Sequence, residues 1–220
     1  MGKNQVKNKE RKMIKYIRLN IAFLPDQKTI DYSISLSQKL GRKELTYFTL
    51  DGLNYHPHVT IYSPEYPKTN LIKIIGFLKK ITGNSKKVIS KFTEVRSNDG
   101  YIWFELKKTT PVEKIHRETV EKMNPLRENH LRDKYQDKRY INSLDRKQSE
   151  NIRNFGYPDV LNLYHPHLTI TRFSDPEKAT TLKKNIKFSR KIICFDRIGV
   201  FRTGEYGTCK ELLYSFQLGK

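Results

Sequence analysis

The chain of 220 residues is predicted to adopt an α+β fold with two pseudo-symmetric lobes, each built from an antiparallel sheet and helices, and with a cleft between them. Two observations predict this fold. The segment Tyr-His-Pro-His occurs at positions 55–58 and again at positions 164–167. Each copy follows an amphipathic helix and precedes a helix and then a hairpin, so the chain consists of two similar halves.

In the first half, alternating apolar residues predict a strand over residues 14–23. Asp26 can cap a helix that Gly41 ends, with an inward face made of Ile30, Ile34 and Leu40. A short strand is expected near residues 45–50. Helical spacing of apolar residues over 71–81 predicts a second helix, which Gly83 ends.

In the second half, the turn signal at residues 97–100, Ser-Asn-Asp-Gly, predicts a hairpin. Thr110, Pro111 and Glu113 supply a capping residue, a proline at the first helical position and a capping-box partner. A further helix is expected to open at 175–177, with Ala179, Leu182 and Ile186 facing inward. The last two strands should turn at residues 203–207.

The domain organisation is expected to be simple. Residues 1–12 are polar and charged without periodicity, which predicts a disordered basic tail. Residues 13–220 then form a single bilobal domain. Within it, residues 124–159 are dense in both charges and only weakly periodic, which predicts an insertion that covers or borders a site.

Composition excludes several classes of protein. With 36% apolar residues, the chain can bury a sizeable core, and it has no apolar run long enough to span a membrane. The basic N-terminus lacks the apolar stretch of a secretory signal, so a cytoplasmic location and no membrane partner are expected. Cys194 and Cys209 are expected on adjacent strands as small core residues, with a cross-strand disulfide as the minor alternative.

The net charge of +20 and the pI near 9.8 favour a polyanionic partner such as RNA. Lysines are concentrated in two clusters. The first cluster consists of Lys68, Lys73, Lys79, Lys80, Lys86, Lys87 and Lys91, and the second of Lys183, Lys184, Lys187, Arg190 and Lys191. A solvated surface explains any single lysine, whereas the clustering favours a face that binds phosphates.

The two repeated segments also carry chemistry. If each lies in a strand, His56, His58 and Thr60 share one face, as do His165, His167 and Thr169. One His-x-Thr on each wall of a cleft would supply a base, an acid and hydroxyl donors for the oxygens of a phosphodiester. Imidazole suits both proton transfers, because its ordinary pKa near 6.5 makes either protonation state accessible.

Paired His-x-Thr motifs followed by a hydrophobic residue, one in each half of a chain of this length, resemble the 2H phosphoesterase superfamily. That group includes the bacterial 2′-5′ RNA ligase/cyclic phosphodiesterase proteins. The resemblance implies a bilobal α+β fold with an active-site cleft, no metal and no cofactor, and catalysis by His58 and His167. Thr60 and Thr169 would then bind the substrate.

Arg172, shortly after the second motif, and the alternating pattern of the last strand also agree with this superfamily. Strand parity, however, places Arg172 on the face opposite His167, so a contact with phosphate would require a bend or a bulge. The basic tail and the insertion depart from the family pattern.

Other residues near the motifs have two interpretations each. His56 and His165 are either structural or support the catalytic pair. Tyr55 and Tyr164, together with Tyr62 and Phe173, could stack on a base but are more often core residues. His116 and His130 are not expected to be catalytic.

Three functions remain open at this point. The first is a metal-independent phosphodiesterase, acting as a monomer on a 2′,3′-cyclic phosphate, a 2′-5′ linkage or a cyclic oligonucleotide. The second is a non-catalytic, basic RNA-binding module on the same scaffold. The third is a metal-dependent hydrolase, because two His-x-His pairs could supply four nitrogen ligands. The absence of a carboxylate at a regular offset in both motifs disfavours the third.

Overall fold

The computed structural model describes residues 15–187 and 191–219, so the predicted tail at 1–12 and Arg190 lie outside the described residues. Six strands pair antiparallel in a closed order, β1-β3-β7-β6-β5-β8, and β8 pairs again with β1. β4, β2 and β9 extend this ring at β1, β7 and β8. The strands are β1 (Tyr16–Pro25), β2 (Thr46–Thr49), β3 (Val59–Tyr62), β4 (Glu65–Pro67), β5 (Val88–Asn98), β6 (Tyr101–Leu106), β7 (His167–Phe173), β8 (Ile192–Thr203) and β9 (Cys209–Gln217).

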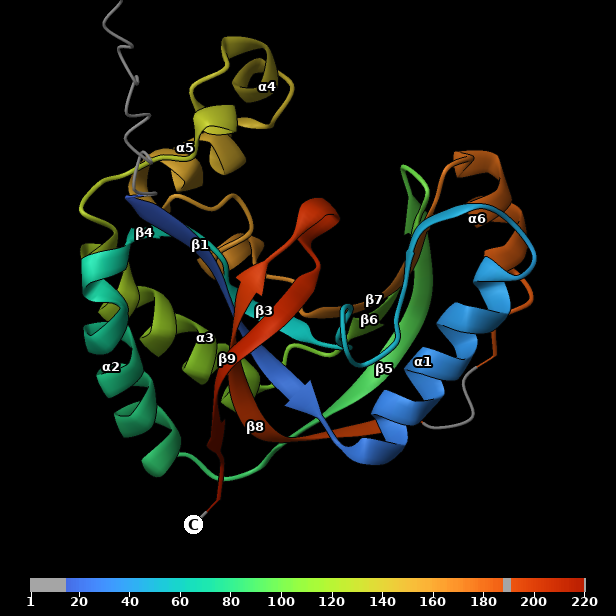
Figure 1. Cartoon of the computed structure of the whole chain (residues 1–220), viewed down its shortest axis with the longest axis horizontal. Coiled ribbons are helices and arrows are strands. Elements are labelled where there is room, and N and C mark those ends of the chain that lie inside the picture. The colour runs from blue at the N-terminus through green and yellow to red at the C-terminus, as the bar shows by residue number, and fades with distance from the viewer. Residues whose placement is uncertain (1–14, 188–190, 220) are drawn as a thin grey trace, which may run out of the picture.

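Helices cover the sheet in two pairs, as Figure 1 shows. On one side α1 (Gln27–Gly41) packs on β7 and β2, while α6 (Pro176–Lys183) packs on β5, β6 and β7. On the other side α2 (Leu71–Gly83) contacts β9, and α3 (Thr110–Met123) contacts β3 and β5. The two lobes and their antiparallel strands confirm the predicted fold class.

An approximate twofold relation follows from the strand pairings. β1, α1, β3, α2 and β5 correspond in order to β6, α3, β7, α6 and β8. The pairs β1–β3 and β6–β7 match, as do β8–β1 and β5–β6. At the join, Val59 pairs with Leu168, and each of these residues directly follows a motif histidine. The axis therefore passes between the two motifs.

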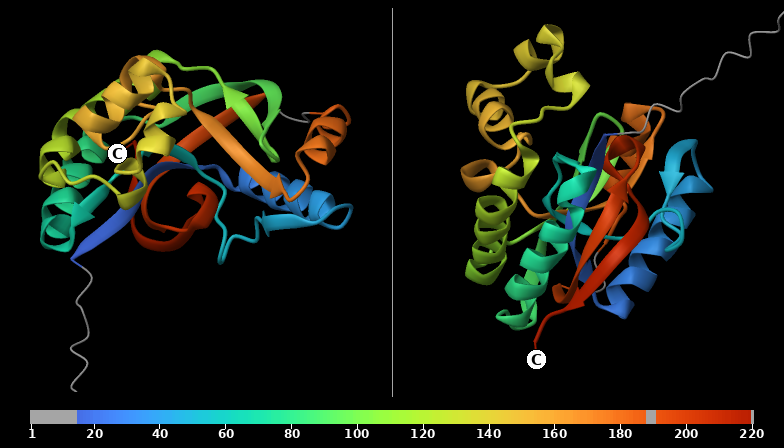
Figure 2. Two further views of the ribbon diagram at one scale, coloured as in Figure 1. Left: turned by 90° about the horizontal axis from the view of Figure 1, so that it is seen from above. Right: turned by 60° about the vertical axis from the view of Figure 1, so that its left-hand side comes forward.

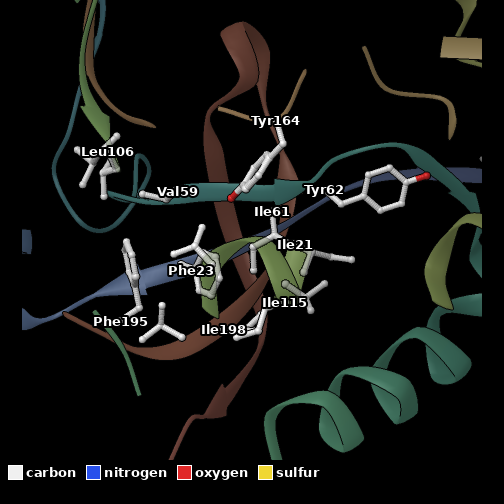
Figure 3. Packing of buried hydrophobic residues seen from close by; sticks show 14 of the residues in the cluster. Ile21, Phe23, Val59, Ile61, Tyr62, Leu106, Ile115, Tyr164, Phe195 and Ile198 are labelled. Atoms are coloured by element: carbon white, nitrogen blue, oxygen red, sulfur yellow. The ribbon is translucent and has the colours of Figure 1, made fainter. Parts of the chain in front are cut away.

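The main core lies between the sheet and these helices. Ile21, Ile61 and Ile198 are fully buried there, from β1, β3 and β8, and Ile115 of α3 packs beside them (Figure 3). Removing this apolar surface from water stabilises the fold by roughly 25 cal/mol per Å². Because strands of both halves contribute to one core, neither lobe has a hydrophobic interior of its own.

Two details of the helices differ from the sequence predictions. The N-cap of α3 is Thr109, and its side chain makes no capping bond, so the predicted capping box is wrong. In α1 the buried face consists of Thr29, Ser33, Ser37 and Leu40, whereas Ile30 and Ile34 are only half-buried. The cap of α1 is as predicted, because the Asp26 carboxylate accepts from Thr29 N at 3.0 Å.

The segment 124–159 contains two further helices, α4 (Lys138–Asn142) and α5 (Arg146–Phe155), which lie above α3 beside β1 and β4 (Figure 2). Short 3₁₀ turns complete the chain at Lys68–Asn70, Asn124–Arg127, Asp133–Tyr135, Leu161–Leu163 and Glu205–Gly207. Cys194 and Cys209 are free thiols on β8 and β9, as expected. None of the described helices is long and apolar enough to cross a membrane.

Candidate active site

The two His-x-Thr motifs meet at one cleft of about 710 Å³, where β3 and β7 lie side by side. Its described lining includes His58, Thr60, His167 and Thr169 from the motifs, and no lysine or arginine. The hairpin tips β5–β6 and β8–β9 and the segment 124–159 supply the remaining walls. The other lining residues are Asn98, Asp99, Tyr101, Trp103, Tyr140, Ser143, Leu144, Tyr157, Asp159, His165, Tyr206 and Gly207.

Both motif histidines are held by the same kind of hydrogen bond. Nδ1 of His58 lies 2.8 Å from the carbonyl oxygen of His56, and Nδ1 of His167 lies 2.9 Å from that of His165. A carbonyl oxygen can only accept, so each Nδ1 carries the proton and donates it. In the neutral ring, Nε2 is then left as the nitrogen that can accept a proton.

Electrostatics keep both rings neutral in the free protein. Burial lowers the pKa of His58 to about 4, and repulsion by His167 acts in the same direction, while the bond to the His56 carbonyl opposes them. Burial, followed by repulsion from His165, also lowers the pKa of His167. Two uncharged imidazoles, each with an unprotonated Nε2, therefore face the cleft near neutral pH.

Asn20 of β1 is a site residue that the sequence analysis missed. Its Nδ2 donates to Oγ1 of Thr60 at 3.0 Å and lies 3.5 Å from Nε2 of His58. The side chain is buried, and its Oδ1 has no partner among the described residues. A signal was present, because Asn20 is a polar residue in an otherwise apolar stretch of β1.

Arg172 lies on the face of the sheet that carries the site, so the parity argument was wrong. Between Thr169 and Thr171 the pairing of β7 with β6 shifts by one residue, which is a β-bulge at Ile170. After the bulge, Arg172 pairs with Tyr101, just as Thr169 pairs with Trp103. An equivalent shift in β3 occurs at Ile61, three residues after His58.

The guanidinium of Arg172 already has partners at the edge of the cleft. It pairs with the Asp99 carboxylate at 2.6 Å and lies 4.7–5.1 Å from the ring centroids of Tyr47, Tyr101 and Tyr206. Tyr101 also donates from its hydroxyl to the carbonyl of Tyr206 at 3.3 Å. Arg172 thus joins the two hairpin tips in the absence of substrate.

His56 and His165 precede the strands rather than lying within them, so strand periodicity does not apply to either. His56 is outside the cleft lining, and its ring lies 5.2 Å from that of Phe201. His165 lines the cleft, with its ring 5.0 Å from that of His167 and its Nδ1 3.7 Å from the Glu105 carboxylate. The carbonyls of both residues orient the rings of His58 and His167.

The aromatic residues nearest the motifs do not line the cleft. Tyr164 is only 5% exposed, its ring stacks on His116 at 3.7 Å, and its hydroxyl donates to the Thr60 carbonyl, so of its two interpretations the structure favours the core residue over the residue that contacts substrate. Tyr62 and Phe173 are also core residues. Tyr55 lies outside the cleft lining, where its hydroxyl accepts from Lys210 at 3.1 Å.

Other aromatic side chains line the cleft instead. The cleft is lined by Tyr101 and Trp103 of β6, Tyr140 and Tyr157 of the segment 124–159, and Tyr206 of the β8–β9 turn. In β6 the alternation of Tyr101, Trp103 and Glu105 was a usable signal. For the segment 124–159, the charge density indicated that the segment borders a site, but not which of its residues do so, because that depends on tertiary packing.

His116 and His130 lie outside the cleft, as expected. The described lysines of both clusters also lie outside it, and Lys79 and Lys80 are exposed on α2. Among residues 15–187 and 191–219, no group of three or more His, Cys, Asp or Glu side chains is arranged to hold a metal ion. The polar groups that line the cleft are imidazoles, hydroxyls, amides and phenols, together with the indole of Trp103 and the carboxylates of Asp99 and Asp159.

Comparisons with known proteins agree with this fold. The sequence matches, over residues 71–207, the model of a family described as "Protein of unknown function (DUF1045)". No curated protein matches the chain in sequence.

Solved structures resemble the chain along nearly its whole length. TT0787 of Thermus thermophilus has a TM-score of 0.58 at 11% identity, covering 92% of this chain and 98% of that one. E. coli LigT in apo form has a TM-score of 0.53 at 9% identity, covering 94% and 99%. E. coli LigT complexed with NADP+ has a TM-score of 0.51 at 10% identity, covering 94% and 100%. These likenesses confirm the fold that the resemblance to the 2H phosphoesterase superfamily implied.

Proposed function

Because the chain belongs to the DUF1045 family and shares the fold of E. coli LigT, we propose that it is a metal-independent phosphodiesterase acting on nucleotides or RNA. One observation carries the proposal. Two His-x-Thr motifs, related by an approximate twofold axis, line a single cleft with both Nδ1 atoms held by main-chain carbonyls.

The histidines would divide the work of acid and base. Nε2 of one neutral ring takes the proton of the attacking water or hydroxyl, while the other ring, once protonated, gives its proton to the leaving oxygen. Both pKa values are lowered in the free protein. The histidine that acts as the acid must therefore take up a proton from solvent when the substrate binds. A phosphodiester anion in the cleft raises the pKa of the imidazole that it contacts.

The threonines would stabilise the phosphoryl group. Thr60 already accepts a hydrogen bond from Asn20, so its own hydroxyl proton is free to point at a non-bridging oxygen. Thr169 offers a second hydroxyl from the other lobe. Trp103 and Tyr157 provide ring faces on which a base can stack.

The nucleotide character of the substrate is supported by charge and by comparison. A chain with a net charge of +20 attracts polyanions, and one structural relative, E. coli LigT, is described in complex with NADP+. The candidate substrates share one feature, which is a nucleoside 2′- or 3′-oxygen bonded to phosphorus. A 2′,3′-cyclic phosphate, a 2′-5′ linkage and a cyclic oligonucleotide all fit this description.

The purified protein should be assayed on these three substrate types in the presence of a strong chelator, with the products mapped. Turnover of at least one substrate under chelation is expected. Loss of turnover that one divalent metal restores would favour the metal-dependent hydrolase. RNA binding without turnover of any of the three would favour the non-catalytic module.

A further inference from the structure

A group of three cations, Arg18, Arg132 and Lys134, lies near Asn20. Arg18 precedes Asn20 by two residues in β1, so both side chains leave the same face of the strand, roughly 7 Å apart. Ile17 and Leu19, between and beside them, are buried on the opposite face. Arg18 is therefore the next side chain along the strand from the residue that contacts His58 and Thr60.

The segment 124–159 supplies two more cations, Arg132 and Lys134, and each interacts electrostatically with Arg18. The guanidinium of Arg132 lies 5.2 Å from the ring centroid of Tyr135, and Nζ of Lys134 lies 5.0 Å from the same centroid. Lys134 also donates to the hydroxyl of Tyr140 at 3.3 Å. Because Tyr140 lines the cleft, Lys134 contacts a residue of the cleft wall from outside the lining.

Positive charge in this group exceeds the negative charge around it. The nearby carboxylates are Glu65, which lies 3.7 Å from Arg132 and binds His130 at 3.0 Å, and Asp159. Two carboxylates thus face three cations. Partial burial, followed by repulsion from Arg132 and Arg18, lowers the pKa of Lys134 to about 8.

Arg18 is also short of hydrogen-bond partners. Among the described residues, its side chain makes one hydrogen bond, a long contact of 3.4 Å from Nη1 to the carbonyl of Gly204, and its buried Nε has no acceptor. A guanidinium presents five donors and holds its charge, so a half-buried one with a single weak acceptor has donors to offer an anion.

We propose that Arg18, Arg132 and Lys134 form a second anion site, which binds a further phosphate of the substrate while His58 and His167 act on the scissile one. The inference rests on the proposed function. It narrows the substrate class to nucleotides that carry a phosphate beyond the reacting diester, such as an oligonucleotide or a phosphorylated dinucleotide. Tyr140 and Tyr157, between the two sites, would border the intervening nucleoside.

Binding of two probes tests the site without requiring turnover. The probes are a 3′,5′-linked dinucleotide with a 5′-phosphate and the same dinucleotide without it, each titrated against the full-length protein at low and moderate salt. The parent protein should bind the phosphorylated probe about 10-fold more tightly, through charge-assisted hydrogen bonds. Added salt should reduce this difference.

Two single variants, Arg18→Gln and Lys134→Gln, and their double variant should remove most of the difference between the probes. Although the ammonium of Lys134 lies against Tyr135 and Tyr140, the residue as a whole is exposed, so its variant keeps the test valid if Arg18→Gln unfolds the protein. The matched control is Lys28→Gln with Lys39→Gln, which removes two exposed charges from α1 in the other lobe and should leave both affinities unchanged.

Equal affinity of the parent for both probes would overturn the second anion site. A control variant that weakens binding as much as the double variant would also overturn it, because net charge alone would then explain the effect. A preference for the phosphorylated probe without turnover of any diester would leave the anion site standing and refute the proposed function. Turnover of a diester without a preference for the phosphorylated probe would support the proposed function and refute the second anion site.

Discussion

His116 of α3 donates a hydrogen bond from Nδ1 to the carbonyl oxygen of Ile61 at 2.8 Å, at the bulge in β3. Its Nε2 accepts from the N–H of Leu161 at 2.8 Å, on the approach to the second motif. In the other half, Ser37 of α1 donates to the carbonyl of Ile170 at 2.7 Å and accepts from the N–H of Leu50. Each bulge is thus held by a side chain of the corresponding helix.

We expect these two side chains to contribute strongly to stability. His116→Ala leaves a cavity and two buried main-chain groups without partners, and should lower the free energy of unfolding by about 3–4 kcal/mol. Ser37→Ala removes the same two kinds of bond with a smaller cavity and should cost about 1–3 kcal/mol. Denaturant unfolding followed by circular dichroism measures both.

The exposed Ser35 on the same helix provides the control, since Ser35→Ala should change stability by less than about 0.5 kcal/mol. If His116→Ala unfolds at the same denaturant concentration as the parent, the ring does not hold the bulge.

Acid should destabilise the protein over a defined range of pH. Burial lowers the pKa of His116 to about 4 from an ordinary value of 6.5, so between these values the unfolded chain binds the proton and the folded one does not. Stability is therefore greatest above pH 6.5 and declines as pH falls toward 4, by about 3 kcal/mol for this group. His58 acts in the same direction.

Unfolding free energies measured at about pH 7 and about pH 4.5, on either side of the ordinary histidine pKa, check this sign. The difference between the two should be clearly smaller in His116→Gln than in the parent. An equal difference in both proteins would mean that His116 is protonated in the folded state at the lower pH.

The two motif histidines should act as a unit in turnover. His58→Ala and His167→Ala should each lower kcat by roughly 10²-fold or more, and the double variant should be little worse than either single one. His130→Gln, outside the cleft, is the control for a lost imidazole and should retain most of the activity. Near-parental turnover in either alanine variant would remove that histidine from the mechanism.

The first lysine cluster should affect binding of long RNA rather than chemistry. Replacing Lys79, Lys80, Lys86 and Lys87 by glutamine should weaken RNA binding and flatten its dependence on salt, because fewer counterions are released. Turnover of a cyclic mononucleotide should hardly change, since none of these lysines lines the cleft. If the variant binds RNA as tightly as the parent across a salt titration, the cluster is only a solvated surface.

Much of the fold was predictable because the repeat fixes the order of elements, and the meeting of His58 with His167 follows from that order. The bulges were not predictable, since they depend on how β3 and β7 register against their neighbours. Without them, parity misplaced Arg172. Likewise, Ser37 is buried because a bulge carbonyl needs its hydroxyl, which no apolar periodicity in α1 could indicate.

The closed order of strands has a consequence for how the chain folds. The ring is completed where β1 meets β8, and there Leu19 pairs with Arg202, far along the chain. Contacts so distant in sequence are slow to form, because the intervening loop must be closed before they stabilise anything. Until β8, which ends at residue 203, has been synthesised, β1 lacks this partner. The ring of strands is therefore expected to close late in folding.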